Sequence, residues 1–318
     1  MKRIFAFIVC CLLLFSASAV AAVAEEERPL TFYFIDAYGA IDSGTKWGDC
    51  TLITFPNGEV MLLDTGIRAA APIVIQKLKD HGVEKIDYLV LSHPHSDHQG
   101  SIREILAEFE VMGFYGNLYA ASDARWGEAY VREQGLPVNR LVAGDSFTVG
   151  DVAVHVLWPL AEDVEVPPEA PGSLDSTTVD VNNHSLVLRF DYAGKSALFT
   201  GDLHKMAELA VLETNGPEAL KADLLKIMHH GHSTSGTDPF LDAVMPSYAV
   251  SMGGVVMTLP EYLKYVKRGC WPYSTWMNGD VKIAFYQDRI EEKAEMPEIN
   301  DYYAQLEVKY PRNRQTEE

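Results

Sequence analysis

Three imidazoles and a carboxylate lie within one short segment in the first third of the chain. Residues 93–98 read His-Pro-His-Ser-Asp-His, and an apolar, strand-like run ends just before them. Neutral imidazole and carboxylate are the usual ligands of zinc and related divalent ions. In an extended segment His93 and His95 point to the same side, so both can bind one ion. Asp97 and His98 lie beyond the bend, where they can reach a second ion. The segment therefore predicts a site for two metal ions.

Two later segments place further ligand types directly after apolar runs. Asp202 follows a Thr-Gly pair at the end of one run, and His229, His230 and His232 follow another. Each segment is weak evidence alone, because Gly-Asp is a common turn and histidines are often structural, solvated or incidental metal binders. Together with residues 93–98 they place ligands at the ends of three strands. They therefore predict one metal site at one edge of a sheet sandwich.

The elements that must position these segments are strands first, followed by alternating helices and strands. Strands are predicted at residues 31–35, 50–55, 60–63, 88–91, 111–115, 152–158, 185–190, 196–200, 224–228, 248–251 and 281–286. Helices are predicted at residues 69–81, 102–108, 121–133, 205–213, 239–244 and 261–267. Residues 159–180 are rich in Pro, Glu, Asp and Ser, which is typical of a long surface loop.

The N-terminus has the pattern of an export signal. Two basic residues precede an apolar run over residues 4–15, and a small-residue segment ends at Ala24 before three glutamates. This pattern predicts a signal peptide over residues 1–24 and an extracellular, periplasmic or cell-surface protein. An uncleaved membrane anchor is the alternative, because residues 4–24 are just long enough to span a bilayer.

The remaining chain is long enough for one layered domain, predicted at residues 25–290, with a charged and partly loose tail at residues 291–318. Loss of the leader would leave Cys50 and Cys270, which could pair in an oxidising compartment. The sequence leaves that pairing open.

The net charge is strongly negative, at -19 for the whole chain. A field of that sign repels nucleic acid and anionic membranes unless a basic groove or bound metals offset it. Nucleic acid is therefore a disfavoured partner, and a small-molecule or cell-envelope ester is the favoured substrate. The densest basic cluster, at residues 264–268, predicts a solvated helix face.

Taken together, the motifs resemble those of the metallo-β-lactamase superfamily. The nearest likeness is to the branch that contains the hydrolase domain of ComEC-type DNA-uptake proteins and the phosphorylcholine esterases of bacterial surfaces. It covers most of residues 31–267 and rests on Phe34-Ile35-Asp36, Gly48-Asp49-Cys50, Leu63-Asp64-Thr65-Gly66, residues 93–98, residues 182–188, Thr200-Gly201-Asp202 and His229-His230-Gly231. The resemblance implies an α/β fold, a four-layer αββα sandwich, with two divalent metals at one sheet edge.

The resemblance also implies which residues bind the metals. First-metal ligands would be His93 and His95, second-metal ligands would be Asp97, His98 and His229, and Asp202 would bridge both. Many members have an additional first-metal histidine in a Gly-His-Ser/Thr segment, where this chain has Thr178-Val179-Asp180-Val181. His184 is the nearby imidazole that could replace it, and its absence would leave the two metals unequally bound. His204, two residues past Asp202, is predicted to be exposed.

Two metals about 3.5 to 4 Å apart can generate hydroxide near neutral pH and stabilise an oxyanion on a phosphoryl or acyl group. Asp97 and Asp202 would then tune the bound water as ligands. Asp64 would either orient a ligand or be a simple turn aspartate. His230 and His232 are candidates for proton delivery or substrate contact, with hydrogen-bonded loop histidines as the alternative.

Three functional hypotheses follow from these motifs. An exported hydrolase of a phosphodiester, such as a cell-envelope phosphate ester or a short nucleic acid, is the first. A lactone, thioester or β-lactam hydrolase is the second. A secreted binding protein with a degenerate site is the third. Zinc is the expected metal, although the ligand set also suits manganese and iron.

Overall fold

The computed structural model describes residues 27–37, 48–118, 126–164, 178–253 and 257–296. The predicted signal peptide or anchor, residues 1–24, lies outside these residues, as does most of the predicted loop and of the charged tail. Within the described part, no helix is long and apolar enough to cross a membrane.

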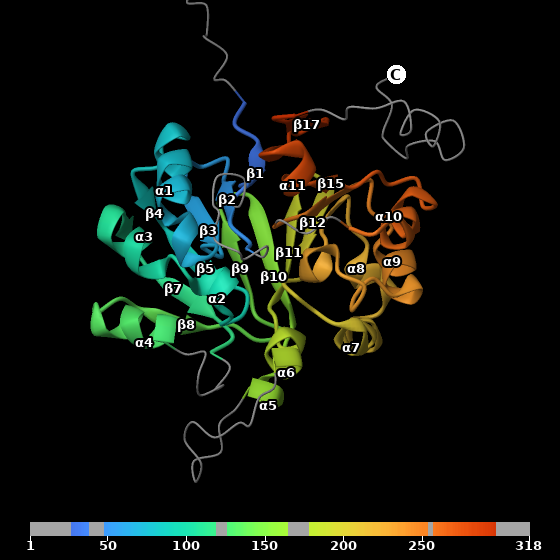
Figure 1. The fold of residues 1–318 in the computed structure, drawn as a ribbon, viewed down its shortest axis with the longest axis horizontal. Helices are drawn as coiled ribbons and strands as arrows, with labels where there is room; N and C mark the ends of the chain where they lie inside the picture. Colours follow the sequence, from blue (N-terminus) through green and yellow to red (C-terminus); the bar gives the residue numbers. More distant parts are fainter. Residues whose placement is uncertain (1–26, 38–47, 119–125, 165–177, 254–256, 297–318) are drawn as a thin grey trace, which may run out of the picture.

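Two mixed sheets face each other in the middle of the fold (Figure 1). The first has the order β17 (Ile290–Ala294), β16 (Val281–Phe285), β1 (Leu30–Phe34), β2 (Thr51–Thr54), β3 (Val60–Leu63), β5 (Tyr88–Leu91), β7 (Phe114–Gly116), β8 (Val138–Arg140). The second has the order β15 (Tyr273–Ser274), β14 (Tyr248–Ser251), β13 (Leu224–Lys226), β12 (Lys195–Phe199), β11 (Val187–Tyr192), β10 (Val152–Trp158), β9 (Ser146–Val149). A short parallel pair joins β4 (Lys85–Ile86) to β6 (Glu110–Val111).

Helices cover the outer face of each sheet (Figure 1). The first sheet carries η1 (Arg68–Ala70), α1 (Ala71–Asp80), α2 (Ser96–Gln99), α3 (Ile102–Glu108) and α4 (Trp126–Glu133). The second carries α7 (Lys205–Asn215), α8 (Pro217–Leu220), α9 (Asp238–Val244) and α10 (Leu259–Val266). Short elements connect these layers: α5 (Ala161–Val164), α6 (Thr178–Asn183), η2 (Met228–Gly231) and α11 (Thr275–Asn278).

Three apolar cores hold the layers together. The central core lies between the sheets, where the ring of Phe32 packs 5.4 to 5.6 Å from those of Phe190, Phe199 and Phe285. Burial of each such side chain contributes about 1.5 to 3 kcal/mol. The two outer cores lie between each sheet and its helices. This layering confirms the predicted four-layer αββα sandwich.

Most predicted elements are present, with ends that differ by a few residues, but some were missed or misread. The sequence predicted a loose tail from Glu291, yet β17 pairs antiparallel with β16, with Ile290 opposite Phe285. Its central residues are charged and hide the strand pattern, while Ile290 and Ala294 at its ends pack against the central core. The predicted loop at residues 159–180 also contains α5 and the start of α6.

Two smaller expectations also differ from the structure. The basic cluster is not simply a solvated face, because Lys264 Nζ donates to Gly236 O at 2.9 Å and Arg268 forms ion pairs with Asp238 and Asp242 at 2.8 and 2.7 Å. These contacts tie the end of α10 to α9 and the loop before it. Cys50 and Cys270 are both buried, in different outer cores, and they do not form a disulfide with each other.

Candidate metal centre

The candidate site lies where strands of both sheets end. Strands β3 and β5 run parallel in the first sheet, and β12 and β13 run parallel in the second. Because parallel strands end at the same sheet edge, their C-terminal loops meet there. Asp64 follows β3, residues 93–98 follow β5, Asp202 follows β12, and Lys226 ends β13. The predicted convergence of three strand ends is therefore observed, with β3 as a fourth.

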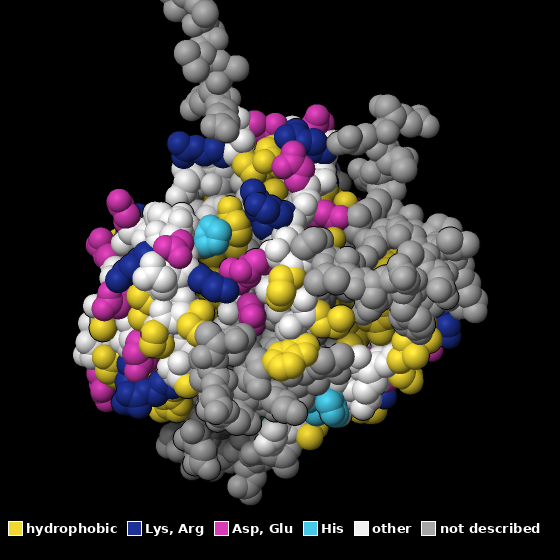
Figure 2. Space-filling model, turned by 45° about the horizontal axis from the view of Figure 1, so that its top comes forward, with side chains coloured by type: hydrophobic (Ala, Val, Ile, Leu, Met, Phe, Trp, Pro, Cys, Tyr) yellow, Lys and Arg dark blue, Asp and Glu magenta, His cyan; other side chains and the backbone are white. Residues whose placement is uncertain are grey.

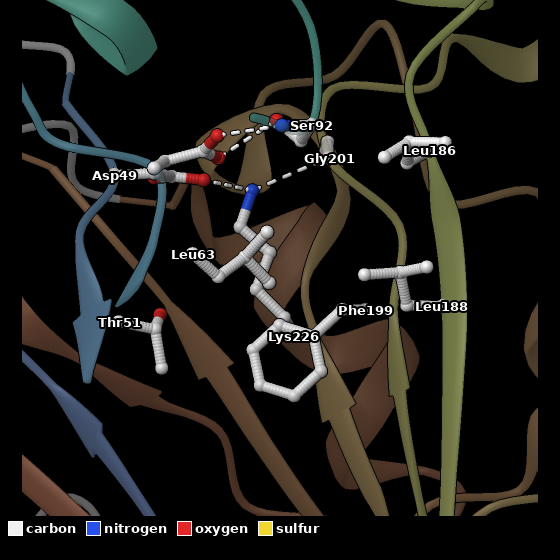
Figure 3. A pocket seen from close by; sticks show the side chains of 10 residues that line it. Asp49, Thr51, Leu63, Ser92, Leu186, Leu188, Phe199, Gly201 and Lys226 are labelled. Atoms are coloured by element: carbon white, nitrogen blue, oxygen red, sulfur yellow. Dashed lines mark hydrogen bonds and ion pairs between the residues drawn. The ribbon is translucent and has the colours of Figure 1, made fainter. Parts of the chain in front are cut away.

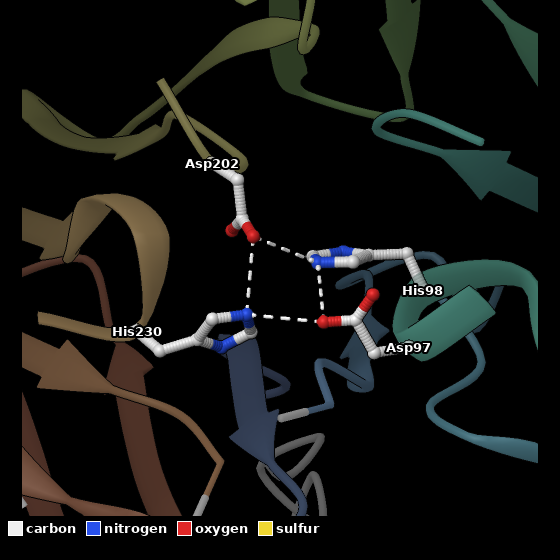
Figure 4. Close-up of side chains that lie close together, drawn as sticks. All are labelled: Asp97, His98, Asp202 and His230. Atoms are coloured by element: carbon white, nitrogen blue, oxygen red, sulfur yellow. Dashed lines mark hydrogen bonds and ion pairs between the residues drawn. The ribbon is translucent and has the colours of Figure 1, made fainter. Parts of the chain in front are cut away.

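One group of side chains, here called the carboxylate cluster, consists of Asp97, His98, Asp202 and His230 (Figure 4). One ligand atom from each residue lies within 4.8 Å of all the others. Asp202 Oδ2 is 3.2 Å from His98 Nε2 and 3.0 Å from His230 Nε2. Asp97 Oδ2 is 3.3 Å from His230 Nε2. The cluster is buried except for Asp97, which is partly exposed.

Each imidazole of the carboxylate cluster has a second carboxylate behind it. His98 Nδ1 lies 2.8 Å from Asp64 Oδ2, and His230 Nδ1 lies 3.1 Å from Asp49 Oδ1. Asp64 thereby orients the His98 ring, while Met252 O, 3.2 Å from His230 Nδ1, helps to orient the His230 ring, so that both Nε2 atoms face the cluster. Ser92 donates its backbone N–H and its hydroxyl to Asp64, both at 2.7 Å. Asp64 therefore orients a cluster residue, which was the first of its two predicted roles.

A buried lysine supplies positive charge beneath the carboxylate cluster. Lys226 Nζ forms an ion pair with Asp49, lies 3.3 Å from Asp202 Oδ1 and donates to Gly201 O at 2.9 Å. Figure 3 shows this side chain reaching up from β13 into a small cavity of about 10 Å³, lined also by Asp49 and Ser92. The pKa of Lys226 is raised to about 12, because Asp49 and Asp202 outweigh the effect of burial.

The charges of the cluster shift the pKa values of its own members. Burial by itself would lower the pKa of His98 and His230, but the neighbouring carboxylates, Asp202 foremost, raise both well above the usual value. Burial would likewise raise the pKa of Asp202, but His230, His98 and Lys226 hold it well below the usual value. The carboxylates and imidazoles of the cluster thus stabilise each other's charged forms.

A second group of side chains, here called the imidazole group, lies next to the carboxylate cluster and reaches Asp202 through His93. It consists of His93, His95, Asn182, His204 and His229. His93 Nε2 is 3.0 Å from His95 Nδ1 and 3.9 Å from Asp202 Oδ2. The rings of His204 and His229 lie 4.6 Å apart. Burial, as the largest cause, lowers the pKa of all four imidazoles, that of His229 to about 4.

Local backbone geometry sets which side chains reach the site. A Cβ on Gly201, whose φ is +50°, would lie 2.5 Å from Ser185 Cβ, so only glycine fits before Asp202. Ser185 Oγ then accepts the backbone N–H of Asp202 at 3.0 Å. His229 and His230 both take left-handed conformations, with φ of 43° and 55°. This turn directs the two adjacent rings to different places.

The structure brings most predicted site residues together, but with a different choice at the histidine pair. His230, predicted for proton delivery, joins the carboxylate cluster, whereas His229, predicted as a ligand, has its Nδ1 2.5 Å from Thr234 Oγ1. His184 Nδ1 contacts Asp180 O at 2.6 Å. His232 is exposed, with Nδ1 3.2 Å from Thr234 Oγ1. The prediction that His204 is exposed is wrong, because its ring packs on His229.

Three contributors had no predicted role: Asp49, Lys226 and Asn182. Asp49 belongs to the Gly-Asp-Cys motif, and a lysine inside the apolar run Leu224-Leu225-Lys226-Ile227-Met228 is a sign of a buried, paired charge. Asn182 belongs to the Asn-Asn-His-Ser segment, in which only the imidazole of His184 was predicted as a possible ligand. Only the tertiary contacts show that its amide, not His184, faces the imidazole group.

Comparison with known proteins relates this site to a family. Residues 48–254, more than half of the chain, match the family model described as "Metallo-beta-lactamase superfamily". ComE operon protein 3 of Bacillus subtilis (strain 168) is 31% identical over 185 residues, which cover 57% of this chain and 22% of that protein. Competence protein ComA of Neisseria gonorrhoeae is 31% identical over 197 residues, which cover 61% of this chain and 24% of that protein.

The chain thus spans only about a quarter of the length of these two relatives. A solved structure of a mutant CmlA beta-hydroxylase superposes with a TM-score of 0.50 at 14% identity, covering 80% of this chain and 54% of the other. That likeness shows the fold alone. The family match confirms the resemblance that the sequence motifs carry.

Proposed function

Because the chain belongs to the metallo-β-lactamase superfamily, we propose that it is a metal-dependent hydrolase whose metal site is the carboxylate cluster. The single observation that carries this proposal is the convergence of two carboxylates and two imidazoles, with ligand atoms all within 4.8 Å, on one partly exposed position. A purely structural network would not need an opening to solvent at Asp97.

The donor set fits a divalent cation. Carboxylate oxygen and imidazole nitrogen together suit zinc, manganese and iron. Asp64 and Asp49 stand behind His98 and His230 as the outer carboxylates that such imidazole ligands usually have. We propose zinc as the resident metal, and two ions when the imidazole group is also filled.

The chain's own residues hold and orient the reacting groups. Divalent ions in this place would polarise an ester and lower the pKa of water. Asp202 contacts both residue groups, so it fixes their separation. Asp97, the exposed member, lies at the side from which a substrate approaches. With a metal bound, His98 Nδ1 would donate to Asp64 and His230 Nδ1 to Met252 O, with Asp49 close by, so that both Nε2 lone pairs face the site.

An anionic ester, such as a phosphodiester, is the substrate class that we propose. An open cavity of about 460 Å³ adjoins Ser96, next to Asp97, and the charged side chains that line it are Arg68 and Arg103. Trp126 also lines it and lies under the guanidinium of Arg103, 5.3 Å from ring centroid to Cζ. Arg68 is paired with Glu104 at 2.9 Å, so the local basic character that we propose for this cavity comes mainly from Arg103.

The face of the molecule shown in Figure 2 does not favour polyanions. Acidic and basic side chains are interspersed on the face shown in Figure 2, without a broad basic stripe. The relatives' names include a competence protein, so single-stranded DNA is a substrate to test. A small envelope phosphate ester remains the first choice, because it needs only the local arginine cavity.

We also propose that the protein acts outside the cytoplasm. The support is the basic, apolar and small-residue pattern over residues 1–24. N-terminal sequencing of secreted protein should begin at Glu25. Protein found only in membranes with Met1 intact would instead favour the anchor.

The test of the enzyme proposal compares chemically distinct esters. Protein loaded with zinc or manganese should hydrolyse bis-p-nitrophenyl phosphate, and chelation should abolish the activity. Nitrocefin and a simple lactone serve as the competing substrates, and single-stranded DNA as the polymeric one. Turnover of nitrocefin or the lactone alone would replace the proposed substrate class. Normal folding with no tightly bound ion would favour a binding protein instead.

A further inference from the structure

Asn182 is buried at the heart of the imidazole group, and its amide is incompletely used. Asn182 is 1% exposed, and its Oδ1 has no hydrogen-bond partner within 3.5 Å among the described residues. Its Nδ2 lies 3.1 Å from His204 Nε2. A buried amide oxygen without a partner costs free energy unless another group occupies the space in front of it.

A series of polar contacts leads from Asn182 to Asp202. His204 lies beside the Nδ2 of Asn182, and a hydrogen-bonding interaction with the amide raises the pKa of His95 against the larger effect of burial. His95 Nδ1 is 3.0 Å from His93 Nε2, which is 3.9 Å from Asp202 Oδ2. This series of contacts therefore ends at Asp202, which also belongs to the carboxylate cluster.

We propose that Asn182 and His204 complete a second metal position beside the carboxylate cluster. They stand in for the additional first-metal histidine that the sequence lacks. The remaining ligands of this position are His93, His95 and Asp202. The proposal rests on the metal-dependent function proposed above, and it extends that function by assigning two ligands that the motifs do not contain.

The chemistry of the two groups suits this role. Amide oxygen is a neutral, hard ligand for divalent ions, weaker than imidazole for zinc. In the structure Asn182 Nδ2 donates to His204 Nε2, so the Nε2 lone pair points towards the amide, and a metal between the two residues would replace this hydrogen bond. The ring of His229 packs on His204 and holds it in place. The second ion should consequently bind more weakly than the ion in the carboxylate cluster.

A purely structural role for Asn182 is already filled by its neighbour. Asn183 Oδ1 accepts the backbone N–H of His204 at 3.3 Å, and Asn183 O accepts the indole N–H of Trp158 at 2.7 Å. The junction between α6 and α7 is therefore anchored by Asn183. Asn183 supplies a matched control. It has the same side chain at the adjacent position, but it does not take part in the series of contacts that leads to Asp202.

The experiment counts bound ions on the full chain, independently of turnover. Metal-free protein is titrated with zinc, and with cobalt as a spectroscopic probe, by calorimetry and elemental analysis. Wild type should bind two ions with unequal affinities. Asn182→Ala and His204→Ala should keep the tighter ion at wild-type affinity and weaken the other about 10- to 100-fold. Asn183→Ala and His184→Ala should keep both.

A variant that is expected to bind metal more tightly shows whether the two loss variants bind weakly only because they misfold. Asn182→His should tighten the weaker ion about tenfold or more, and cobalt spectra should show coupling between two ions at lower metal concentration. Circular dichroism checks each fold. One ion in wild type, or two ions at wild-type affinity in both loss variants, would overturn this inference while leaving the hydrolase proposal standing. Absence of any bound ion would instead overturn the hydrolase proposal itself.

Discussion

The two sides of the site differ in charge although one six-residue segment contributes to both. The carboxylate cluster contains carboxylates and imidazoles whose pKa is raised, above a buried lysine. The imidazole group contains imidazoles whose pKa is lowered, together with an amide. Asp202 is the carboxylate that they share. The same residue types therefore acquire opposite properties according to the number of carboxylates within a few ångströms.

This difference shows how one fold can hold two metals unequally. On the cluster side, a cation would lie close to both Asp97 and Asp202, so charge favours its binding. On the other side, the ligands are neutral and Asp202 alone supplies charge. The sequence predicted unequal binding from a missing histidine, and the distribution of carboxylates gives a physical reason to test that prediction.

The largest expected effect comes from removing the shared residue. Asp202→Asn should release metal from both sides, because the amide cannot balance a cation. Activity should fall by at least about 1000-fold, equivalent to several kcal/mol of transition-state stabilisation. Elemental analysis and phosphodiesterase assays measure both effects. Retained metal and activity in this variant and in His95→Ala would break the comparison altogether.

Substitutions of the adjacent histidines His229 and His230 distinguish the carboxylate cluster from the imidazole group. His230→Asn should weaken zinc binding at the cluster about 100-fold or more, because His230 Nε2 lies 3.0 Å from Asp202. His229→Asn should cost about tenfold or less and act on the weaker ion, because His229 acts through His204. Chelator competition gives both affinities. A larger loss from His229 would restore that residue as the ligand, as the sequence predicted.

Removing the buried lysine tests the charge balance beneath the cluster. Lys226→Met leaves two buried carboxylates without their cation and should destabilise the metal-free protein by about 3 to 5 kcal/mol. Added zinc should recover part of this loss. Lys77→Met is the control, since its ion pair with Asp280 is closer to solvent and should cost about 1 kcal/mol or less. Chemical denaturation with and without zinc measures the difference, and equal losses would contradict it.

The smallest effect concerns the loop behind the imidazole group. The Glu208 carboxylate accepts hydrogen bonds from the backbone N–H groups of Gly236 and Thr237 at 2.6 and 2.7 Å. The pKa of Glu208 is raised, and burial is the largest cause of the shift. The folded state thus favours the protonated acid, so its contribution to stability is full below the unfolded pKa, near 4.5, and falls as the pH rises through the raised value.

Glu208→Gln removes this titration. Wild-type melting temperature, relative to the variant, should decline by a few degrees or less between pH 4 and 7, on top of a constant offset from the lost acceptor. Melting curves at matched ionic strength measure it. A constant difference across that range would show that this loop does not respond to the carboxyl charge.

Much of the fold could be predicted because its patterns are local. Strand β10 alternates buried and half-buried positions, and the apolar runs before residues 93–98 and Asp202 are strands as predicted. Strand β17 was missed because its register does not depend on a hydrophobic pattern of its own. The register depends on β16, the neighbouring strand in the sheet. Charged residues can form an edge strand when the partner strand supplies the hydrogen bonds.

The sequence by itself determined the ligand types, their order and the sheet edge at which they meet, since side-chain chemistry and strand periodicity can be read locally. The tertiary structure decided which of two adjacent histidines faces the cluster, because two left-handed residues turn the chain there. It also decided that Lys226 lies beneath Asp202 and that Asn182 lies beside His204. Those choices depend on distances between residues far apart in the chain, which only the packing of the two sheets sets.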